Sequence, residues 1–134
     1  MRVKDLMHEA VKVSAAHSVA EAAAFMEKKL SGSALVEDSG KIVGIITERD
    51  ILKKVVARNK NPSSVIVGDV MSGLLITIEA DEDILEASRK MDEHRIRRLI
   101  VTENGKMVGK ITANSISRNV RYMNASRLVE SMRF

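Results

Sequence analysis

The residues of this sequence best placed to do chemistry lie in the segment G-I-I-T-E-R-D-I, Gly44–Ile51. An apolar strand runs directly into a helix capped by Thr47, and the free backbone N–H groups of a first helical turn favour an anion. Asp50, one turn later, places a carboxylate on the same side of the helix start, where it can accept hydrogen bonds from both hydroxyls of a ribose. The segment predicts either a nucleoside phosphate site or simply a capped helix with an acid in its first turn.

A second segment, G-K-I-T-A-N-S-I at Gly109–Ile116, has the same spacing. Thr112 matches Thr47, but Ser115 stands at the position of Asp50. A serine hydroxyl cannot accept from a diol as a carboxylate does. We therefore predict a second site that is weaker, differently selective or empty.

Both segments belong to an internal repeat. Val11–Val55 aligns with Ile76–Val120 without a gap, and V-K-D-L-M at Val3–Met7 aligns with V-G-D-V-M at Val67–Met71 after a one-residue change of register. Self-similarity over such a length indicates two copies of one structural unit. We divide the chain into repeat 1, repeat 2 and a tail with an apolar and a basic face, at residues 1–60, 61–122 and 123–134.

Each repeat is expected to fold as β-α-β-β-α, which places the protein in the α/β class. In repeat 1 we expect a short helical turn at Val3–Met7, a strand at Ala10–Val13 and a helix at Val19–Leu30. Two strands at Ser33–Glu37 and Lys41–Ile46 and a final helix from Thr47 through Val56 follow. The apolar positions of the long helix share one face: Val19, Ala22, Ala23, Met26 and Leu30.

Local signals support these elements. Ser18 with Glu21 predicts a capping box at the start of the long helix, as Asp83 with Glu86 does in repeat 2. The glycines Gly40 and Gly105 end D-S-G and E-N-G turns, where a tight hairpin requires a positive φ.

Composition narrows the class of protein. The 134 residues hold no Cys, which excludes disulfides, thiolate metal sites and a Cys nucleophile. The net charge of +4 indicates either an anionic ligand or partner, or a solvated basic surface. No apolar run is long enough to span a bilayer and the N-terminus is not a signal peptide, so we expect a cytoplasmic protein. No spacing of Ser, His and Asp singles out a nucleophile, so we expect no enzyme.

Taken together, the sequence resembles the cystathionine-β-synthase (CBS) domain family from Val3 to about Val120. The resemblance rests on the V-K-D-L-M and V-G-D-V-M openings, the small residues Ser31-Gly32-Ser33, the G-x-x-T-x-x-D-I segment and the tandem arrangement. It implies two repeats packed sheet to sheet as one module with two clefts, commonly paired as a homodimer. It also implies a regulatory module that requires no cofactor, binds AMP, ADP, ATP or S-adenosylmethionine, and acts on an unidentified effector protein.

The resemblance also assigns residues to the two clefts. In the first, Thr47 and Asp50 are expected to hold phosphate and ribose, and the base pocket is expected at Val11, Val13, Ser33 and Ala34. In the second, weaker cleft the corresponding residues are Ile76, Ile78, Arg98, Thr112 and Ser115. No catalytic or metal-binding residue is implied.

Other groups have alternative interpretations. Arg95, Arg97 and Arg98 either contact ligand phosphates, with Arg98 the expected contact, or form a solvated rim, or pair with Asp92 and Glu93. The scattered histidines are expected at the surface or at helix ends. The alternative function is a basic nucleic-acid-binding protein that uses the CBS pair as a scaffold, although an aromatic content of 2% provides almost no stacking platform.

Overall fold

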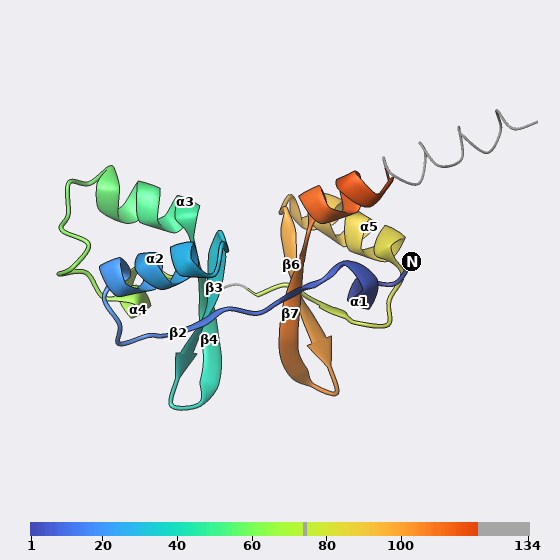
Figure 1. Cartoon of the computed structure of the whole chain (residues 1–134), viewed down its shortest axis with the longest axis horizontal. Helices are drawn as coiled ribbons and strands as arrows, with labels where there is room; N and C mark the ends of the chain where they lie inside the picture. The colour runs from blue at the N-terminus through green and yellow to red at the C-terminus, as the bar shows by residue number, and fades with distance from the viewer. Residues whose placement is uncertain (74, 121–134) are drawn as a thin grey trace, which may run out of the picture. The chain divides into compact units, whose positions relative to one another are not determined.

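The computed structural model describes residues 1–73 and 75–120. The predicted tail, 123–134, lies outside the described residues. The chain divides into two compact units (Figure 1): a first unit, Ala10–Leu75, and a second unit made of Met1–Glu9 together with Ile76–Phe134. Two sheets with their helices confirm the α/β class.

The first unit carries a sheet with strand order β2-β3-β4. Strands β2 and β3 run parallel and β3 and β4 antiparallel. In Figure 1, α2 and α3 lie on the same side of this sheet. Its elements in chain order are β2 (Lys12–Ser14), α2 (Val19–Lys28), β3 (Ser33–Asp38), β4 (Lys41–Thr47), α3 (Glu48–Ile51), the π-helix η1 (Leu52–Val56) and α4 (Val67–Val70).

The second unit repeats this plan with one strand more, in the order β1-β7-β6-β5. The two-residue strand β1, which the sequence did not predict, pairs antiparallel with β7. A helix follows β7 at residues 113–120. The other elements are α1 (Val3–Leu6), β1 (His8–Glu9), β5 (Thr77–Glu79), α5 (Ile84–His94), β6 (Arg98–Glu103) and β7 (Lys106–Thr112).

The first turn of each repeat packs in the unit built mainly by the other repeat. The helix α1 of repeat 1 places Val3 and Leu6 in the core of the second unit, and α4 of repeat 2 places Val67 and Val70 in the core of the first. Equivalent backbone hydrogen bonds hold both turns: Val3 N to Glu82 O and Val67 N to His17 O. The repeats seen in the sequence therefore differ from the compact units by two segments, residues 1–9 and 61–75, which we call the exchanged segments.

The turns and the helix cap that were predicted from neighbouring residues are present in the structure. Both hairpins close through two residues with positive φ, Ser39 and Gly40 in one and Asn104 and Gly105 in the other. Two such residues are the requirement of a tight turn that matches strand twist. Ser18 caps α2 by accepting from Glu21 N, which is one half of the predicted capping box, while the Glu21 carboxylate accepts from the Ser18 hydroxyl instead of closing the other half.

Three sequence predictions need correction. The Glu86 carboxylate does not close a capping box with Asp83 but pairs with Arg89, while Asp83 alone caps α5. Leu30 does not join the buried face of α2: the helix ends before it, and Leu30 has φ of 53° and is 94% exposed. The final helix of repeat 1 is not uniformly α-helical, because η1 follows α3 with a bond from Ala57 N to Leu52 O.

Candidate functional site

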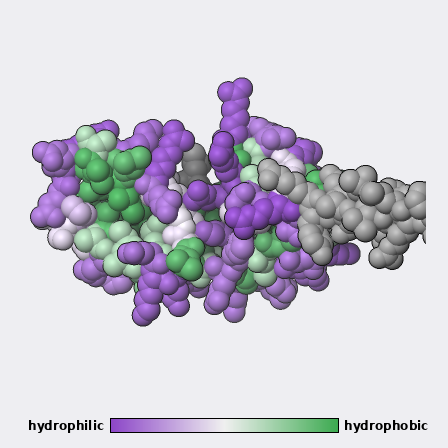
Figure 2. All heavy atoms as spheres, turned by 45° about the horizontal axis from the view of Figure 1, so that its top comes forward, coloured by the Kyte–Doolittle hydropathy of each residue, from purple (hydrophilic) through white to green (hydrophobic). Residues whose placement is uncertain are grey.

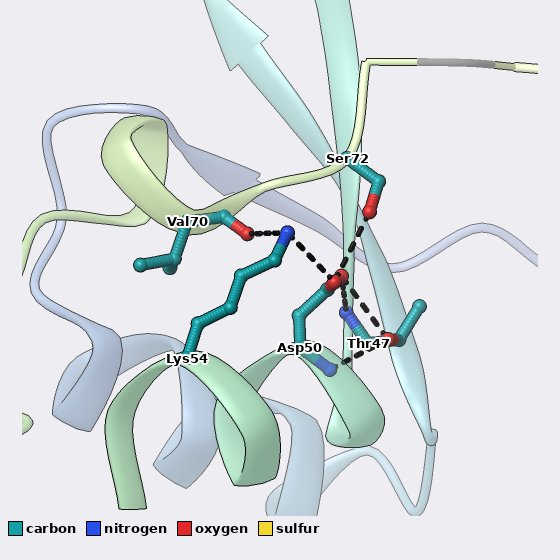
Figure 3. A network of polar contacts seen from close by, with 5 residues as sticks. All are labelled: Thr47, Asp50, Lys54, Val70 and Ser72. Carbon is teal, nitrogen blue, oxygen red and sulfur yellow. Dashed lines mark hydrogen bonds and ion pairs between the residues drawn. The ribbon is translucent and has the colours of Figure 1, made fainter. Parts of the chain in front are cut away.

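The predicted Thr47–Asp50 segment forms a closed corner at the junction of β4 and α3 (Figure 3). Thr47 Oγ1 accepts from Asp50 N at 3.1 Å, and Asp50 Oδ2 accepts from Thr47 N at 3.0 Å and from Thr47 Oγ1 at 3.1 Å. This reciprocal pattern is a capping box, which satisfies backbone donors that the helix itself leaves unpaired. The capping interpretation of these residues is therefore confirmed.

The other oxygen of Asp50 faces two residues that the sequence did not single out. Asp50 Oδ1 accepts from Ser72 Oγ at 3.0 Å and forms an ion pair with Lys54 Nζ at 3.1 Å. Lys54 Nζ also donates to Val70 O at 2.9 Å (Figure 3). Because the Asp50 side chain is only 10% exposed, these contacts compensate a buried charge. We call Thr47, Asp50, Lys54 and Ser72 the Asp50 corner.

The second unit builds an equivalent corner without an acid. Ser115 N donates to Thr112 Oγ1 at 3.1 Å, and the two hydroxyl oxygens are 2.9 Å apart and hydrogen-bonded. Ser115 Oγ is also hydrogen-bonded to His8 Nε2 at 2.8 Å, and Asn119 Nδ2 donates to Ser115 O at 2.9 Å. We call these four residues the Ser115 corner. Its partners are hydroxyl, imidazole and amide groups, so it lacks the ion pair of the first.

The residues expected around the base of the ligand in the first cleft are mostly buried. Val13 and Ala34 belong to the hydrophobic core of the first unit, and Val11 packs against that core. Val11 O already accepts from Leu35 N at 2.7 Å. Ser33 is 3% exposed and lies opposite Thr47 in the β3–β4 register. The structure thus brings Ser33 to the Asp50 corner and places the apolar side chains in the core beside it.

The second unit shows the same arrangement with one substitution. Ile78 is in its core and Ile76 packs against it. Arg98 lies opposite Thr112 in the β6–β7 register, the place that Ser33 holds in the first unit. Within the described part of the chain, no hydrogen-bond acceptor reaches the buried Arg98 Nη1. A buried, unpaired guanidinium nitrogen is costly unless an anion joins it.

The rest of the arginine cluster is exposed. Arg95 ends α5 in the left-handed region and Arg97 lies at the surface. In the described ranges no ion pair joins the cluster to Asp92 or Glu93, and Glu93 pairs instead with Arg89. The proposed pairing with Asp92 and Glu93 is therefore wrong, and the exposure of Arg95 and Arg97 is compatible with either a solvated rim or a contact with ligand phosphate.

Sequence reasoning missed His8, Lys54 and Ser72. His8 and Ser72 each follow the aligned openings V-K-D-L-M and V-G-D-V-M, so they are equivalent positions. The signal available in the sequence was that a polar residue, His8 or Ser72, follows the opening of each repeat. Without a structure, however, nothing in the alignment says that the residue after each opening reaches the other repeat's helix cap.

Comparison with known proteins now decides the family. The family model described as the CBS domain matches residues 3–57 and 67–122. This chain belongs to the CBS-domain family. The two matched stretches make it a CBS pair, as the tandem repeat predicted.

Three similar proteins give the CBS pair its context. An uncharacterised protein of Methanopyrus kandleri, MK0525, is 39% identical over 109 residues, which cover 81% of this chain and 56% of that protein. A solved structure from Pyrococcus horikoshii has a TM-score of 0.80 and 32% identity, covering 90% of this chain and 92% of that one. The CBS domain pair of protein MJ0100, solved with 5′-methylthioadenosine and S-adenosyl-L-methionine, has a TM-score of 0.80 and 29% identity, covering 92% and 98%.

Beside the Asp50 corner, the CBS pair has an apolar groove on the helical side of its first unit. The groove holds about 500 Å³, and Figure 2 shows hydrophobic side chains gathered over this part of the surface. Leu52 and Val56 line it and are 60% and 59% exposed. Among the described residues, the groove is lined by Ala23, Met26, Glu27, Leu30, Ser31, Gly32, Glu48, Ile51, Leu52 and Val56.

Two carboxyl groups of the CBS pair have lowered pKa values because each pairs with a cation. The Lys4 ammonium donates to Asp81 and lowers the pKa of that carboxyl, and Arg89 does the same for Glu86. Across residues 1–73 and 75–120, no three His, Cys, Asp or Glu side chains lie close enough to hold a metal ion. Over the same residues, no helix has the length and apolar character needed to cross a membrane.

Proposed function

We propose that this CBS pair is a cytoplasmic, non-catalytic regulatory module whose principal ligand is an adenosyl compound bound at the Asp50 corner. The observation that carries the proposal is the buried Asp50 carboxylate, held beside Thr47 at the start of a helix. A carboxylate accepts hydrogen bonds from both hydroxyls of a ribose, and the backbone N–H groups at the start of a helix favour a phosphate. The similar MJ0100 pair was solved with two adenosyl compounds. AMP, ADP, ATP and S-adenosylmethionine are the proposed ligands, and no cofactor is required.

The second site is proposed to be weaker toward the ribose and selective for negative charge. Ser115 offers no carboxylate for a diol, whereas the buried Arg98 Nη1 lacks an acceptor in the described structure. A ligand phosphate satisfies that nitrogen with a charge-assisted hydrogen bond. The contrast predicts that the two sites rank the same set of nucleotides differently.

Thermal shift with a ligand panel tests the proposal. A ligand that binds only the folded state raises the melting temperature, so one or more of AMP, ADP, ATP, NAD and S-adenosylmethionine should raise it in a concentration-dependent way. Asp50→Ala should abolish most of the rise, and Asp92→Ala, which removes an exposed acid in the second unit, should not. Absence of any shift, together with no calorimetric heat for the whole panel, contradicts the proposal.

We further propose that the module works as a homodimer and passes its state to a separate effector protein. The exposed apolar groove supports pairing, because burying Leu30, Leu52 and Val56 against a second copy removes unfavourable contact with water. Light scattering after gel filtration should report a dimer, and Leu52→Glu should convert it to a monomer. A monomeric wild-type protein at all concentrations contradicts pairing.

A further inference from the structure

Both oxygens of the Asp50 carboxylate are engaged in the structure, and a carboxylate has about four lone-pair sites. Oδ2 accepts two hydrogen bonds, from Thr47 N and Thr47 Oγ1, and Oδ1 accepts one from Ser72 Oγ. The fourth contact is the ion pair of Oδ1 with Lys54 Nζ at 3.1 Å, which places the ammonium group beside the remaining lone pair. If Asp50 holds a ribose diol, as the proposed function requires, at least one of these partners must leave.

The four partners differ in how easily they move. Thr47 is three residues from Asp50 and its two contacts close the capping box, so losing them uncaps α3. Ser72 belongs to a segment that pairs with Ile45 through two backbone hydrogen bonds, Ile45 N to Ser72 O and Ser72 N to Ile45 O. The Ser72 hydroxyl can turn about its single side-chain bond, but the fixed backbone keeps it beside Asp50. Lys54 differs in charge and reach: it is the cationic partner, and its side chain is long, flexible and 39% exposed. Lys54 can leave Asp50 by rotating about its own side-chain bonds, without any change in the backbone.

Releasing Lys54 has an electrostatic consequence. Its ammonium group, which donates to Val70 O at 2.9 Å while it is paired with Asp50, loses the one ion-pair partner that it has in the described structure. Asp50 in turn gains two neutral hydroxyl donors in place of a cation. An uncharged nucleoside leaves both charges without a counterion, whereas a nucleoside 5′-phosphate offers Lys54 a new anion on the same ribose that occupies Asp50.

The second unit lacks the means for this exchange. Ser115 stands at the position of Asp50 and Asn119 at that of Lys54. Asn119 Nδ2 donates to the backbone oxygen of Ser115, so neither side chain is charged and no ion pair has to be broken. Both charges are present at one corner and both are absent at the other, which is the pattern expected of two residues that act as a pair.

We propose that Lys54 is a specificity-determining residue of the first site. On ligand binding it exchanges its ion pair with Asp50 for the ligand's phosphate, so the site prefers a nucleoside 5′-phosphate to the uncharged nucleoside. The inference deepens the proposed function and rests on it. It names the phosphate-bearing ligands as the preferred class for the Asp50 corner and gives Lys54 the discriminating role.

The test is a titration with AMP and with adenosine, followed by the backbone amide resonances of Thr47 and Asp50. The amides of Thr112 and Ser115 report the second site separately. Wild type should bind AMP about tenfold more tightly than adenosine, the ratio expected for one charge-assisted contact. Lys54→Met should bring the ratio close to one by weakening AMP while adenosine binds equally or more tightly. Lys54→Arg should keep the preference, and Lys53→Met, the exposed neighbour, should resemble wild type.

The outcomes separate the two proposals. If wild type binds both ligands at Thr47 and Asp50 with equal affinity, or if Lys54→Met weakens both equally, the exchange is wrong and the adenosyl site remains. If neither ligand moves these resonances in the folded wild type, the proposed function fails as well. Because Lys54→Met removes a partner of a buried acid, its fold is checked by the same spectra. If that variant unfolds, loss of the AMP preference in the folded Lys54→Arg overturns the exchange, and its retention supports it.

Discussion

The two corners share a frame and differ in chemistry. In each, a threonine at the end of a strand caps the following helix, and the residue three positions later returns a hydrogen bond to it. Three positions then differ between the first and second unit: Asp50, Lys54 and Ser72 against Ser115, Asn119 and His8.

The comparison shows that the cap geometry does not depend on the charge it carries. Thr112 and Ser115 reproduce the 3.1 Å cap hydrogen bond of Thr47 and Asp50 without a carboxylate. The acid at the first corner is therefore not needed to start the helix. Two of its four contacts belong to the capping box, but its contacts with Ser72 and Lys54 are not explained by capping, and ligand binding is the explanation proposed above.

The largest effect is expected from Asp50→Ser, which gives the first corner the residue of the second. Lys54 loses its counterion and the capping box loses its acid, so the free energy of unfolding should fall by about 3 kcal/mol. Affinity at the first site should fall at least about tenfold, the effect of one lost charged contact. Urea denaturation and the amide titration measure the two effects. Wild-type ligand affinity in the folded variant contradicts the role given to the acid.

The next effect concerns the glycines that face the exchanged segments. A Cβ on Gly44 would lie 2.7 Å from Ser72 O and 2.8 Å from Met71 Sδ, and a Cβ on Gly109 would meet His8 O still more closely. Gly44→Ala and Gly109→Ala should each lower the free energy of unfolding by about 2 kcal/mol, with Gly109→Ala the larger.

Gly73→Ala is the matched control for these glycines, because a Cβ there meets nothing within 4 Å. Its free energy of unfolding should stay within about 0.5 kcal/mol of wild type. Equal effects for all three variants in chemical denaturation contradict close approach of the exchanged segments.

A smaller effect is expected from Ser115→Asp, which gives the second corner the acid of the first. The new carboxylate supplies the acceptors that a ribose diol needs, so nucleotide affinity at the second site should rise by up to about tenfold. The amide resonance of Thr112 reports it. Asn114→Asp adds the same charge at an exposed neighbouring position and should change little. If both variants behave alike, net charge rather than placement of the acid controls the site.

The smallest effect concerns the ion pair that only one exchanged segment has. Lys4 Nζ donates to Asp81 Oδ1 at 2.9 Å, and this hydrogen bond lowers the pKa of Asp81 from its ordinary value of 3.8. Gly68 and Ala16 hold the equivalent positions in the first unit. Because the folded-state pKa of Asp81 is lowered, its stabilising contribution is present above the unfolded-state value and is lost as the pH falls through the folded-state value.

Carboxyl NMR titration checks this last prediction. In wild type the Asp81 midpoint should lie below 3.8, and in Lys4→Met it should move up toward that value. The attachment of α1 should then weaken only in acid, with no counterpart at α4. An unchanged midpoint in Lys4→Met contradicts the assigned cause.

The sequence predicted those parts of the fold that depend on neighbouring residues. The hairpin at Ser39 and Gly40 and the cap at Ser18 are set by a few adjacent side chains, and they formed as expected. The end of α2 was not predictable in the same way. A Gly normally takes the left-handed position that ends a helix, but Leu30 takes it here, two residues before Gly32.

The residues of the helix caps could be predicted from the sequence, but the residues that reach the caps from the exchanged segments could not. Thr47 and Asp50 stand out because their spacing within one helical turn fixes their geometry. Ser72 and His8 do not, since they reach the corners only through the exchanged segments. A five-residue amphipathic turn such as V-K-D-L-M carries no signal of which core will bury it.

The exchanged segments also set an order of assembly during synthesis. All residues of the first unit, Ala10–Leu75, are continuous in the chain and are available as soon as residue 75 has left the ribosome. The second unit draws on Met1–Glu9, which precede the first unit in the chain and can complete their core only after residues 76–120 have been made. A circular permutant opened between Glu9 and Ala10, with the original ends joined, makes each unit a continuous stretch and removes that delay.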